Sequence, residues 1–255
     1  MATRLYVSNP ANPTWPNPQH VSAAWDVYGE ADAWRLDTLN TTTNQNAAPQ
    51  VNKDVAGPVN VLISQFILPG LDAQTISGTV KGIFRFDVSN TAADACVQTV
   101  MRVVDLSTGT VRGTLLAATD PGISATVDTP GYEISTSIAS RRVPTGWSGS
   151  GATLTSVDAE AGDALVIEVG ARVYEVASTS RWVLLSLYHS DTVSDRPEDE
   201  TTGTTSLNPW IEFSDDITFS QVATVRGGDE LAIPINIGSG GGSAPPTTGQ
   251  TWPRS

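Results

Sequence analysis

Residues 75–88 read Thr-Ile-Ser-Gly-Thr-Val-Lys-Gly-Ile-Phe-Arg-Phe-Asp-Val. Apart from Ile83, the large apolar side chains occupy even-numbered positions: Ile76, Val80, Phe84, Phe86 and Val88. Successive side chains of a β-strand point to opposite faces, so this alternation predicts a strand that buries one face and leaves the other in water. Gly78 and Gly82 fall on the apolar face, where we expect a bulge or a close contact with another backbone.

The segment that follows predicts a hairpin. Residues 96–104 carry valine and methionine at both odd and even positions, which is typical of a central strand covered on both sides. Residues 105–109 (Asp-Leu-Ser-Thr-Gly) have the composition of a turn, and residues 111–117 are again strand-like. We therefore expect residues 96–117 to form two antiparallel strands.

Later strands begin with a shared pattern. Residues 162–165 (Gly-Asp-Ala-Leu) and 228–231 (Gly-Asp-Glu-Leu) both combine a turn-forming Gly-Asp with a leucine that starts an inward-facing set. After the first of them, one face of the strand is expected to carry Leu165, Ile167, Val169, Ala171 and Val173. Further strands are expected at 182–188 and 210–219. Long helical periodicity and a fixed-period repeat are both absent from the sequence, so an all-β sandwich is favoured over a propeller or solenoid.

Both ends of the chain differ from the middle. Residues 9–18 contain four prolines, which fix φ and remove donors, so an extended arm is expected there. Residues 238–255 are rich in Gly, Ser, Pro and Thr and cannot bury enough apolar surface to offset their ordering entropy. The predicted organisation is an N-terminal arm (1–20), a β-sandwich (21–235) and a C-terminal tail (236–255).

Composition limits the partners. The net charge is −13 and the 14 basic residues are scattered, which argues against nucleic acid and against an anionic membrane surface. No span reaches the roughly 18 apolar residues that a membrane helix needs. The first residues lack the apolar core of a secretory signal, and the single cysteine excludes an intramolecular disulfide. We expect a protein made in a reducing cytosol.

The sequence shows no recognisable catalytic or metal-binding motif. His20 and His189 belong to no His/Cys cluster, so no metal or other cofactor is expected. Cys96 lies among apolar residues and is interpreted as a buried, inert thiol. Residues 146–151 (Gly-Trp-Ser-Gly-Ser-Gly) miss the Gly-x-Ser-x-Gly spacing of a nucleophile elbow. The acidic run 191–200 could hold calcium or act as a glycosidase-like pair, but a solvated loop explains it better.

The seven tryptophans fall into two groups. Four are expected in the core because their surroundings are strand-like: Trp25, Trp34, Trp182 and Trp210. The other three lie in loops or arms, where an exposed indole is costly unless a partner covers it. We predict assembly contacts at Trp15 and Trp252, and surface recognition at Trp147.

Five groups of residues carry a family resemblance. They are Met1–Tyr6; Trp25 with Trp34–Leu36; Val103-Val104 with Val111–Leu116; Gly162-Asp163 with Glu168–Arg172; and Pro209–Ser214. Together they resemble a family of uncharacterised virion proteins from tailed bacteriophages of high-GC hosts, over roughly residues 1–220. The resemblance implies an antiparallel, jelly-roll-like β-sandwich repeated around a particle, and it supplies no catalytic residues. The C-terminal tail lies outside it.

Three functions follow as hypotheses. In the first, the chain is a structural virion protein that contacts copies of itself and other virion proteins, in the tail by preference or as a capsid decoration. In the second, the same sandwich binds a host-surface glycan through Trp147 and neighbouring polar loops. In the third, which is not favoured, loop carboxylates degrade a glycan. The prediction is a non-enzymatic virion protein.

Overall fold

The structure is a computed structural model, and every regular element in its described residues is a β-strand. It describes residues 2–7, 20–28, 32–37, 46–47, 50–52, 58–88, 93–118, 133–134, 136–137, 139–145, 147–176, 182–188, 194–199, 202 and 207–220. The strands are β1 (Thr3–Val7), β2 (Asp32–Asp37), β3 (Asn46–Ala47), β4 (Gln50–Asn52), β5 (Val59–Pro69), β6 (Gln74–Ile76), β7 (Thr79–Val88), β8 (Ala93–Asp105), β9 (Thr110–Leu116), β10 (Ala139–Arg142), β11 (Ala152–Thr153), β12 (Val157–Ala159), β13 (Ala164–Val176), β14 (Trp182–Tyr188) and β15 (Trp210–Phe213).

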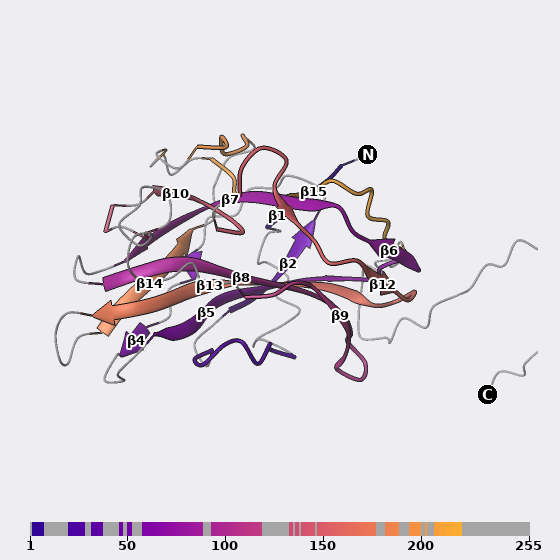
Figure 1. The fold of residues 1–255 in the computed structure, drawn as a ribbon, viewed down its shortest axis with the longest axis horizontal. Helices are drawn as coiled ribbons and strands as arrows, with labels where there is room; N and C mark the ends of the chain where they lie inside the picture. Colours follow the sequence, from indigo (N-terminus) through magenta and orange to yellow (C-terminus); the bar gives the residue numbers. More distant parts are fainter. Residues whose placement is uncertain are drawn as a thin grey trace, which may run out of the picture. The chain divides into compact units, whose positions relative to one another are not determined.

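Thirteen of these strands form one sheet that folds into two facing layers. The strand order along the main path is β3-β14-β7-β15-β1-β2-β5-β13-β8-β9. Outside this path, β10 and β11 pair with β7, and β4 pairs with β14. The remaining strands, β6 and β12, form a separate two-stranded sheet. Only β2 and β5 pair in parallel among the named strands. The layer around β7 and β15 faces the layer of β5, β13 and β8 (Figure 1). The all-β sandwich is thus confirmed, and its jelly-roll connectivity stays a prediction.

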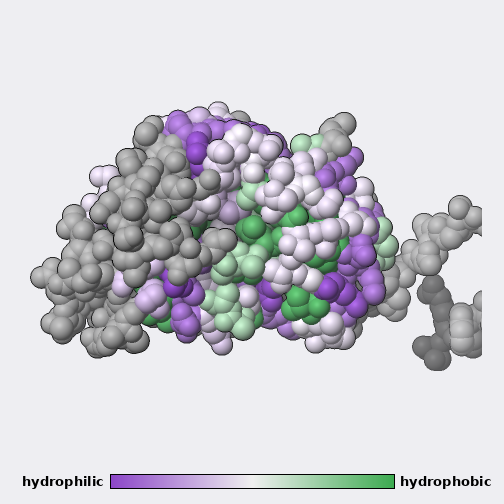
Figure 2. Space-filling view, in the orientation of Figure 1, coloured by the Kyte–Doolittle hydropathy of each residue, from purple (hydrophilic) through white to green (hydrophobic). Residues whose placement is uncertain are grey.

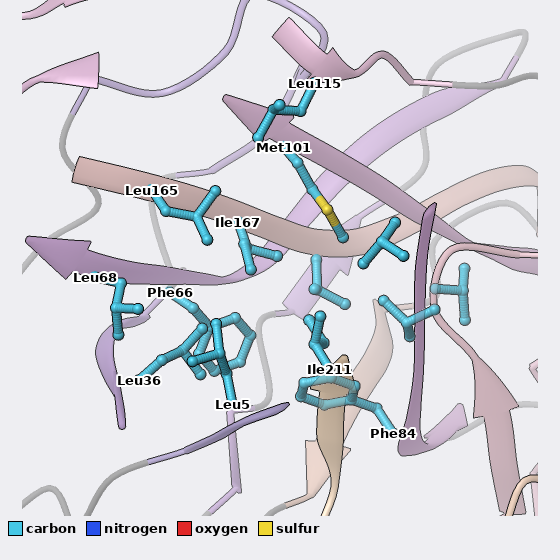
Figure 3. Close-up of a cluster of buried hydrophobic side chains, with 14 of the residues drawn as sticks. Leu5, Leu36, Phe66, Leu68, Phe84, Met101, Leu115, Leu165, Ile167 and Ile211 are labelled. Carbon is cyan, nitrogen blue, oxygen red and sulfur yellow. The ribbon is translucent and has the colours of Figure 1, made fainter. Parts of the chain in front are cut away.

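The main core lies between the two layers. Phe66 of β5, Met101 of β8 and Ile167 of β13 point toward Phe84 of β7 and Ile211 of β15, and the ring centroids of Phe66 and Phe84 are 5.5 Å apart (Figure 3). All five side chains are at most 1% exposed. Close packing of this kind is the main source of stability in a sandwich, because each layer buries one face of its strands.

The alternation in residues 75–88 predicts one buried face correctly, but the opposite face is not left in water, since Ile83 and Arg85 are 0% and 5% exposed. Its five even-numbered apolar side chains are all at most 2% exposed and belong to the main core. The predicted strand is interrupted between β6 and β7 at Gly78, whose φ is +73°. The expected close backbone contact occurs at Gly82, where a Cβ would lie 2.6 Å from the carbonyl oxygen of Trp210.

The other strand predictions that fall on described residues hold with small changes of boundary, and the strand predicted from residue 228 lies outside the described residues. β8 and β9 form the predicted hairpin, with Gly109 at φ +74° in its turn. β13 points its odd-numbered side chains into the core, and β14 spans the predicted residues 182–188. The strand predicted at 210–219 is shorter, since β15 ends at Phe213.

The predicted N-terminal arm needs a correction. Residues 3–7 form β1, which pairs with β15 on one side and with β2 on the other. Leu5 is fully buried in the main core. Because β1 joins the two halves of the sheet path, it is part of the sandwich. The described residues all belong to the compact unit Met1–Ser220, and the predicted tail 236–255 lies outside them.

Candidate functional site

Several residues singled out in the sequence lie outside the described residues: Trp15, His189, Asp191, Glu200 and Trp252. Among the described ones, Cys96 is 1% exposed, and its Sγ lies 3.8 Å from the hydroxyl oxygen of Tyr174. His20 is exposed, and it is the backbone carbonyl of His20, not its imidazole, that accepts a hydrogen bond from Arg102 at 2.6 Å. The burial expected of the thiol is confirmed.

Trp147 is buried, contrary to the expectation of an exposed indole. Its side chain is 5% exposed, and its Nε1–H donates to the carbonyl oxygen of Gly82 at 3.1 Å. The ring packs with Ile83 and Trp210 in a small apolar cluster, and the guanidinium of Arg142 lies 4.9 Å from its centroid. The reason is Ile83, which places an apolar side chain on the outer face of β7 that Trp147 covers. The buried ring offers a glycan almost no surface.

The described part of the acidic run, residues 194–199, is engaged with basic residues of the sheet. Asp195 Oδ2 lies 2.6 Å from Arg4 Nη1, and Glu198 Oε1 lies 2.6 Å from Lys81 Nζ. Tyr6 also donates to Asp195 Oδ2 at 3.1 Å, and partial burial together with this charge raises the pKa of Tyr6. These two carboxylates hold their loop against β1 and β7, so their contacts are those of a structural loop.

A buried arginine fixes the next part of the same loop. Arg196 is 2% exposed, and its Nη1 donates to Ser140 Oγ and to the carbonyl oxygen of Thr202, both at 2.9 Å. Its own carbonyl accepts a hydrogen bond from Trp210 Nε1 at 2.7 Å. Burial, with a contribution from the nearby charge of Arg85, lowers the pKa of Arg196 to about 10. The side chain therefore remains charged at neutral pH inside the protein.

A carboxylate is buried on the outer face of the other layer. Glu168 of β13 is 0% exposed, and its Oε1 accepts hydrogen bonds from Arg102 Nη2 at 2.7 Å and Gln65 Nε2 at 3.0 Å. Ser22 N also donates to Oε1 at 3.0 Å, and Trp25 Nε1 donates to Oε2 at 2.9 Å. Four donors thus satisfy one carboxylate, which is the arrangement that a buried charge requires.

These contacts bind residues 20–28, here named the strap, across β5, β13 and β8. Trp25 is 4% exposed and packs against Leu62 and Val100. Gly170 provides the space for its ring, since a Cβ there would lie 2.7 Å from Trp25 Cζ3 and 2.0 Å from the carbonyl oxygen of Val61. The core position expected for Trp25 is confirmed, although its cluster is separate from the main core. The site that holds the strap therefore combines the space beside Gly170, which the Trp25 ring fills, with the buried carboxylate of Glu168.

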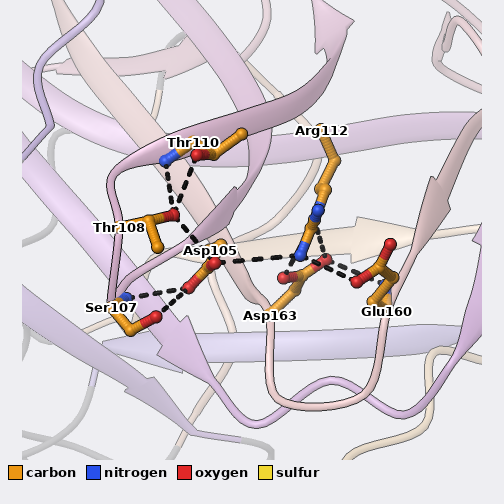
Figure 4. Close-up of polar contacts among 7 residues, drawn as sticks. All are labelled: Asp105, Ser107, Thr108, Thr110, Arg112, Glu160 and Asp163. Carbon is orange, nitrogen blue, oxygen red and sulfur yellow. Dashed lines mark hydrogen bonds and ion pairs between the residues drawn. The ribbon is translucent and has the colours of Figure 1, made fainter.

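The hairpin tip and the start of β13 are joined by a second charged cluster. Arg112 lies 2.8 Å from Glu160 Oε2, 3.2 Å from Asp163 Oδ2 and 3.8 Å from Asp105 Oδ2 (Figure 4). The Ser107 and Thr108 hydroxyls and the backbone N–H of Ser107 donate to Asp105 and lower its pKa to about 2. The carboxylates here surround a guanidinium and fix two turns.

Three further observations describe the rest of the surface and the charged side chains of the described residues. Among them, no three or more His, Cys, Asp and Glu side chains are close enough together to hold a metal ion. The same part of the chain has no helix long and apolar enough to cross a membrane. Its exposed large hydrophobic residues are Val27, Tyr28 and Val111. On the face drawn in Figure 2, apolar residues reach the surface in small areas bordered by polar ones.

The strap site was missed at the sequence level, although a signal was present. Glu168 interrupts the apolar run Leu165–Val169, and Arg102 interrupts Val100–Val104. A strand covered on both faces can carry a charge only if that charge is paired. Two opposite charges in two such strands therefore indicated a buried pair, but not the strap that completes it.

Comparisons with known proteins assign no family. No family model matches the chain, and no curated protein matches it significantly. Three solved structures show some similarity. The structure of infectious bursal disease virus strain Gx has 10% identity and a TM-score of 0.29, and the match covers 67% of this chain and 33% of that chain. An α-amino acid ester hydrolase has 9% identity, a TM-score of 0.30 and coverages of 82% of this chain and 35% of its own, and infectious bursal disease virus strain Gt has 12% identity, a TM-score of 0.23 and coverages of 66% and 38% in the same order. Two of the three are virus structures, and the chain spans about a third of the length of the chains it matches. TM-scores of 0.30 or less fall short of a shared fold and assign no function.

Proposed function

We propose that this protein is a structural component of a tailed-bacteriophage virion, that it assembles in multiple copies and that it has no enzymatic activity. The tail is the favoured location, and capsid decoration is the alternative. The proposal rests on the resemblance of residues 1–220 and on the contacts that the resembling segments make with one another.

The observation that supports the proposal is that segments carrying the resemblance contact one another across long sequence distances. Arg4 Nε lies 2.8 Å from Glu212 Oε2, and its guanidinium lies 4.0 Å from the centroid of the Trp210 ring. Trp25 binds Glu168, and Arg112 of the hairpin binds Asp163 before β13. These contacts place the resembling segments in one folded framework, and the proposal builds on that framework.

The chemistry of the described carboxylates supports a non-enzymatic role. Asp195 and Glu198 are held by Arg4 and Lys81, and Glu168 accepts four hydrogen bonds in a fully buried position. An acid-base pair needs carboxylates that face a substrate. The carboxylates named here face other parts of the same chain.

The test is composition analysis of purified particles of the virus that encodes this chain. Quantitative mass spectrometry is expected to find the chain in a fixed number of copies, well above one per particle. Antibody labelling of separated tails and capsids then distinguishes the two locations. Absence of the chain from purified particles, or hydrolysis of host polysaccharide by the purified chain, would refute the proposal.

The predicted assembly contacts of Trp15 and Trp252 are part of the same proposal. Replacing Trp252 by Ala is expected to leave the melting temperature unchanged and to reduce incorporation into particles. Thr251→Ala is the matched control at the neighbouring position. If the Trp252→Ala chain were incorporated as well as the Thr251→Ala chain, Trp252 would not be an assembly contact.

A further inference from the structure

The first strand of the chain fills a specific gap in the sheet. β1 lies between β15 and β2, with Arg4 paired to Glu212 and Val7 paired to Leu36. Thr3 Oγ1 accepts a hydrogen bond from the backbone N–H of Ile217 at 2.7 Å. Without β1, the facing edges of β15 and β2 would lose their ladder partners, and an exposed strand edge is a template for a strand of matching sequence.

The strap attaches the same N-terminal region at a second, independent place. Ser22 and Trp25 bind Glu168, and the carbonyl of His20 binds Arg102. None of these contacts involves a residue of β1 or of its neighbours β15 and β2. The strap can therefore remain on its own subunit whether or not β1 occupies the gap in that subunit.

The connection between β1 and the strap is long enough to reach another subunit. Residues 8–19 comprise twelve residues, four of them proline. At about 3.3 Å per residue, such a segment spans up to about 40 Å. A compact unit of 220 residues is expected to have a radius of gyration of about 17 Å, so this span is similar to its diameter. The contacts of β1 are non-covalent and are the same whether β1 comes from the same chain or from a second copy.

We propose that in the assembled state β1 is inserted between β15 and β2 of a neighbouring copy of the chain. This inference rests on the proposed function, because exchange needs copies held close together. High local concentration in a particle turns insertion into a nearly intramolecular step. Each subunit gives its first strand to one neighbour and keeps its strap, so exchange links copies without a new interface.

Disulfide trapping tests the exchange directly. Arg4 and Glu212 are register partners on β1 and β15, and both side chains are partly exposed, so cysteines there are within bonding distance. One full-length chain carries Arg4→Cys and another Glu212→Cys, each with Cys96→Ala. The two chains are co-refolded, allowed to assemble and oxidised. The control mixture pairs Lys81→Cys with Glu212→Cys, because Lys81 and Glu212 are register partners on β7 and β15.

Exchange predicts mixed disulfide dimers from the Arg4→Cys mixture and none from the control mixture. Statistical mixing of equal amounts would link about half of the chains. The double variant Arg4→Cys/Glu212→Cys, oxidised as an isolated monomer, confirms that the bond forms. Assemblies seen by light scattering without mixed dimers overturn the exchange but leave the proposed function. A chain that stays monomeric at all concentrations, without mixed dimers, also overturns the exchange, whereas the proposed function is decided by the composition of purified particles.

Discussion

Replacing Glu168 by leucine removes the buried acceptor that holds the strap. The carboxylate is fully buried and lies 2.7 Å from Arg102, whose side chain is 6% exposed. Breaking a buried ion pair by removing one partner costs about 3–5 kcal/mol, because the other charge is left without compensation. For a unit of this size, that loss lowers the melting temperature by roughly 6–20 °C.

The matched control is Glu160→Leu. Glu160 forms an ion pair of nearly the same length with Arg112, 2.8 Å, but its side chain is 70% exposed. An exposed pair contributes at most about 1 kcal/mol, since water and salt screen it. The two variants therefore change the same residue type, with the same kind of partner, at opposite extremes of burial.

Urea unfolding at pH 7, followed by circular dichroism, measures both free energies of unfolding. Hydrogen exchange at the Leu62 amide, which donates to the carbonyl of Val27 in the strap at 2.8 Å, reports strap release separately. The double variant Arg102→Met/Glu168→Leu is expected to recover part of the loss. Recovery stays incomplete because the donors of Ser22, Gln65 and Trp25 still lack their acceptor. A Glu168→Leu variant within 1 kcal/mol of Glu160→Leu would refute the reasoning.

Further expectations concern single sites. The pKa of Asp105 should be about 2, below the usual aspartate pKa of 3.8. The stability that its carboxylate contributes is therefore present above about pH 4 and is lost as the pH falls through 2. A carboxyl NMR titration with a midpoint near 3.8 would contradict this. Trp147→Ala should lower the free energy of unfolding by about 3–5 kcal/mol, and an unchanged urea midpoint would show the indole to be exposed. Cys96 should react with a thiol reagent only after unfolding; rapid modification of the native protein would disprove its burial. The Gly170→Ala variant should be less stable and should exchange the Leu62 amide faster, because the alanine Cβ has no space beside Trp25.

The sequence alone determined the strands and the faces that they bury. Alternation is a local property, so residues 75–88 and 164–173 could be assigned an inward face without knowing what covers them. The hairpin turn at 105–109 was likewise readable, because Asp105, Ser107 and Thr108 bond within a few residues of one another. Local chemistry was sufficient for each of these features.

Only the tertiary structure decided what covers the outer faces of the two layers. The sequence predicts Trp147 at the surface, but its indole is buried over Ile83. It also predicts an arm over residues 3–7, which form a strand inside the sheet. Both depend on partners far away in the chain, as does the contact of Trp25 with Glu168, 143 positions later. Sequence periodicity states that a face is apolar or that a charge must be paired. Any partner within contact distance can bury an apolar side chain or pair a charge. The path of the whole chain therefore decides which distant segment meets that face.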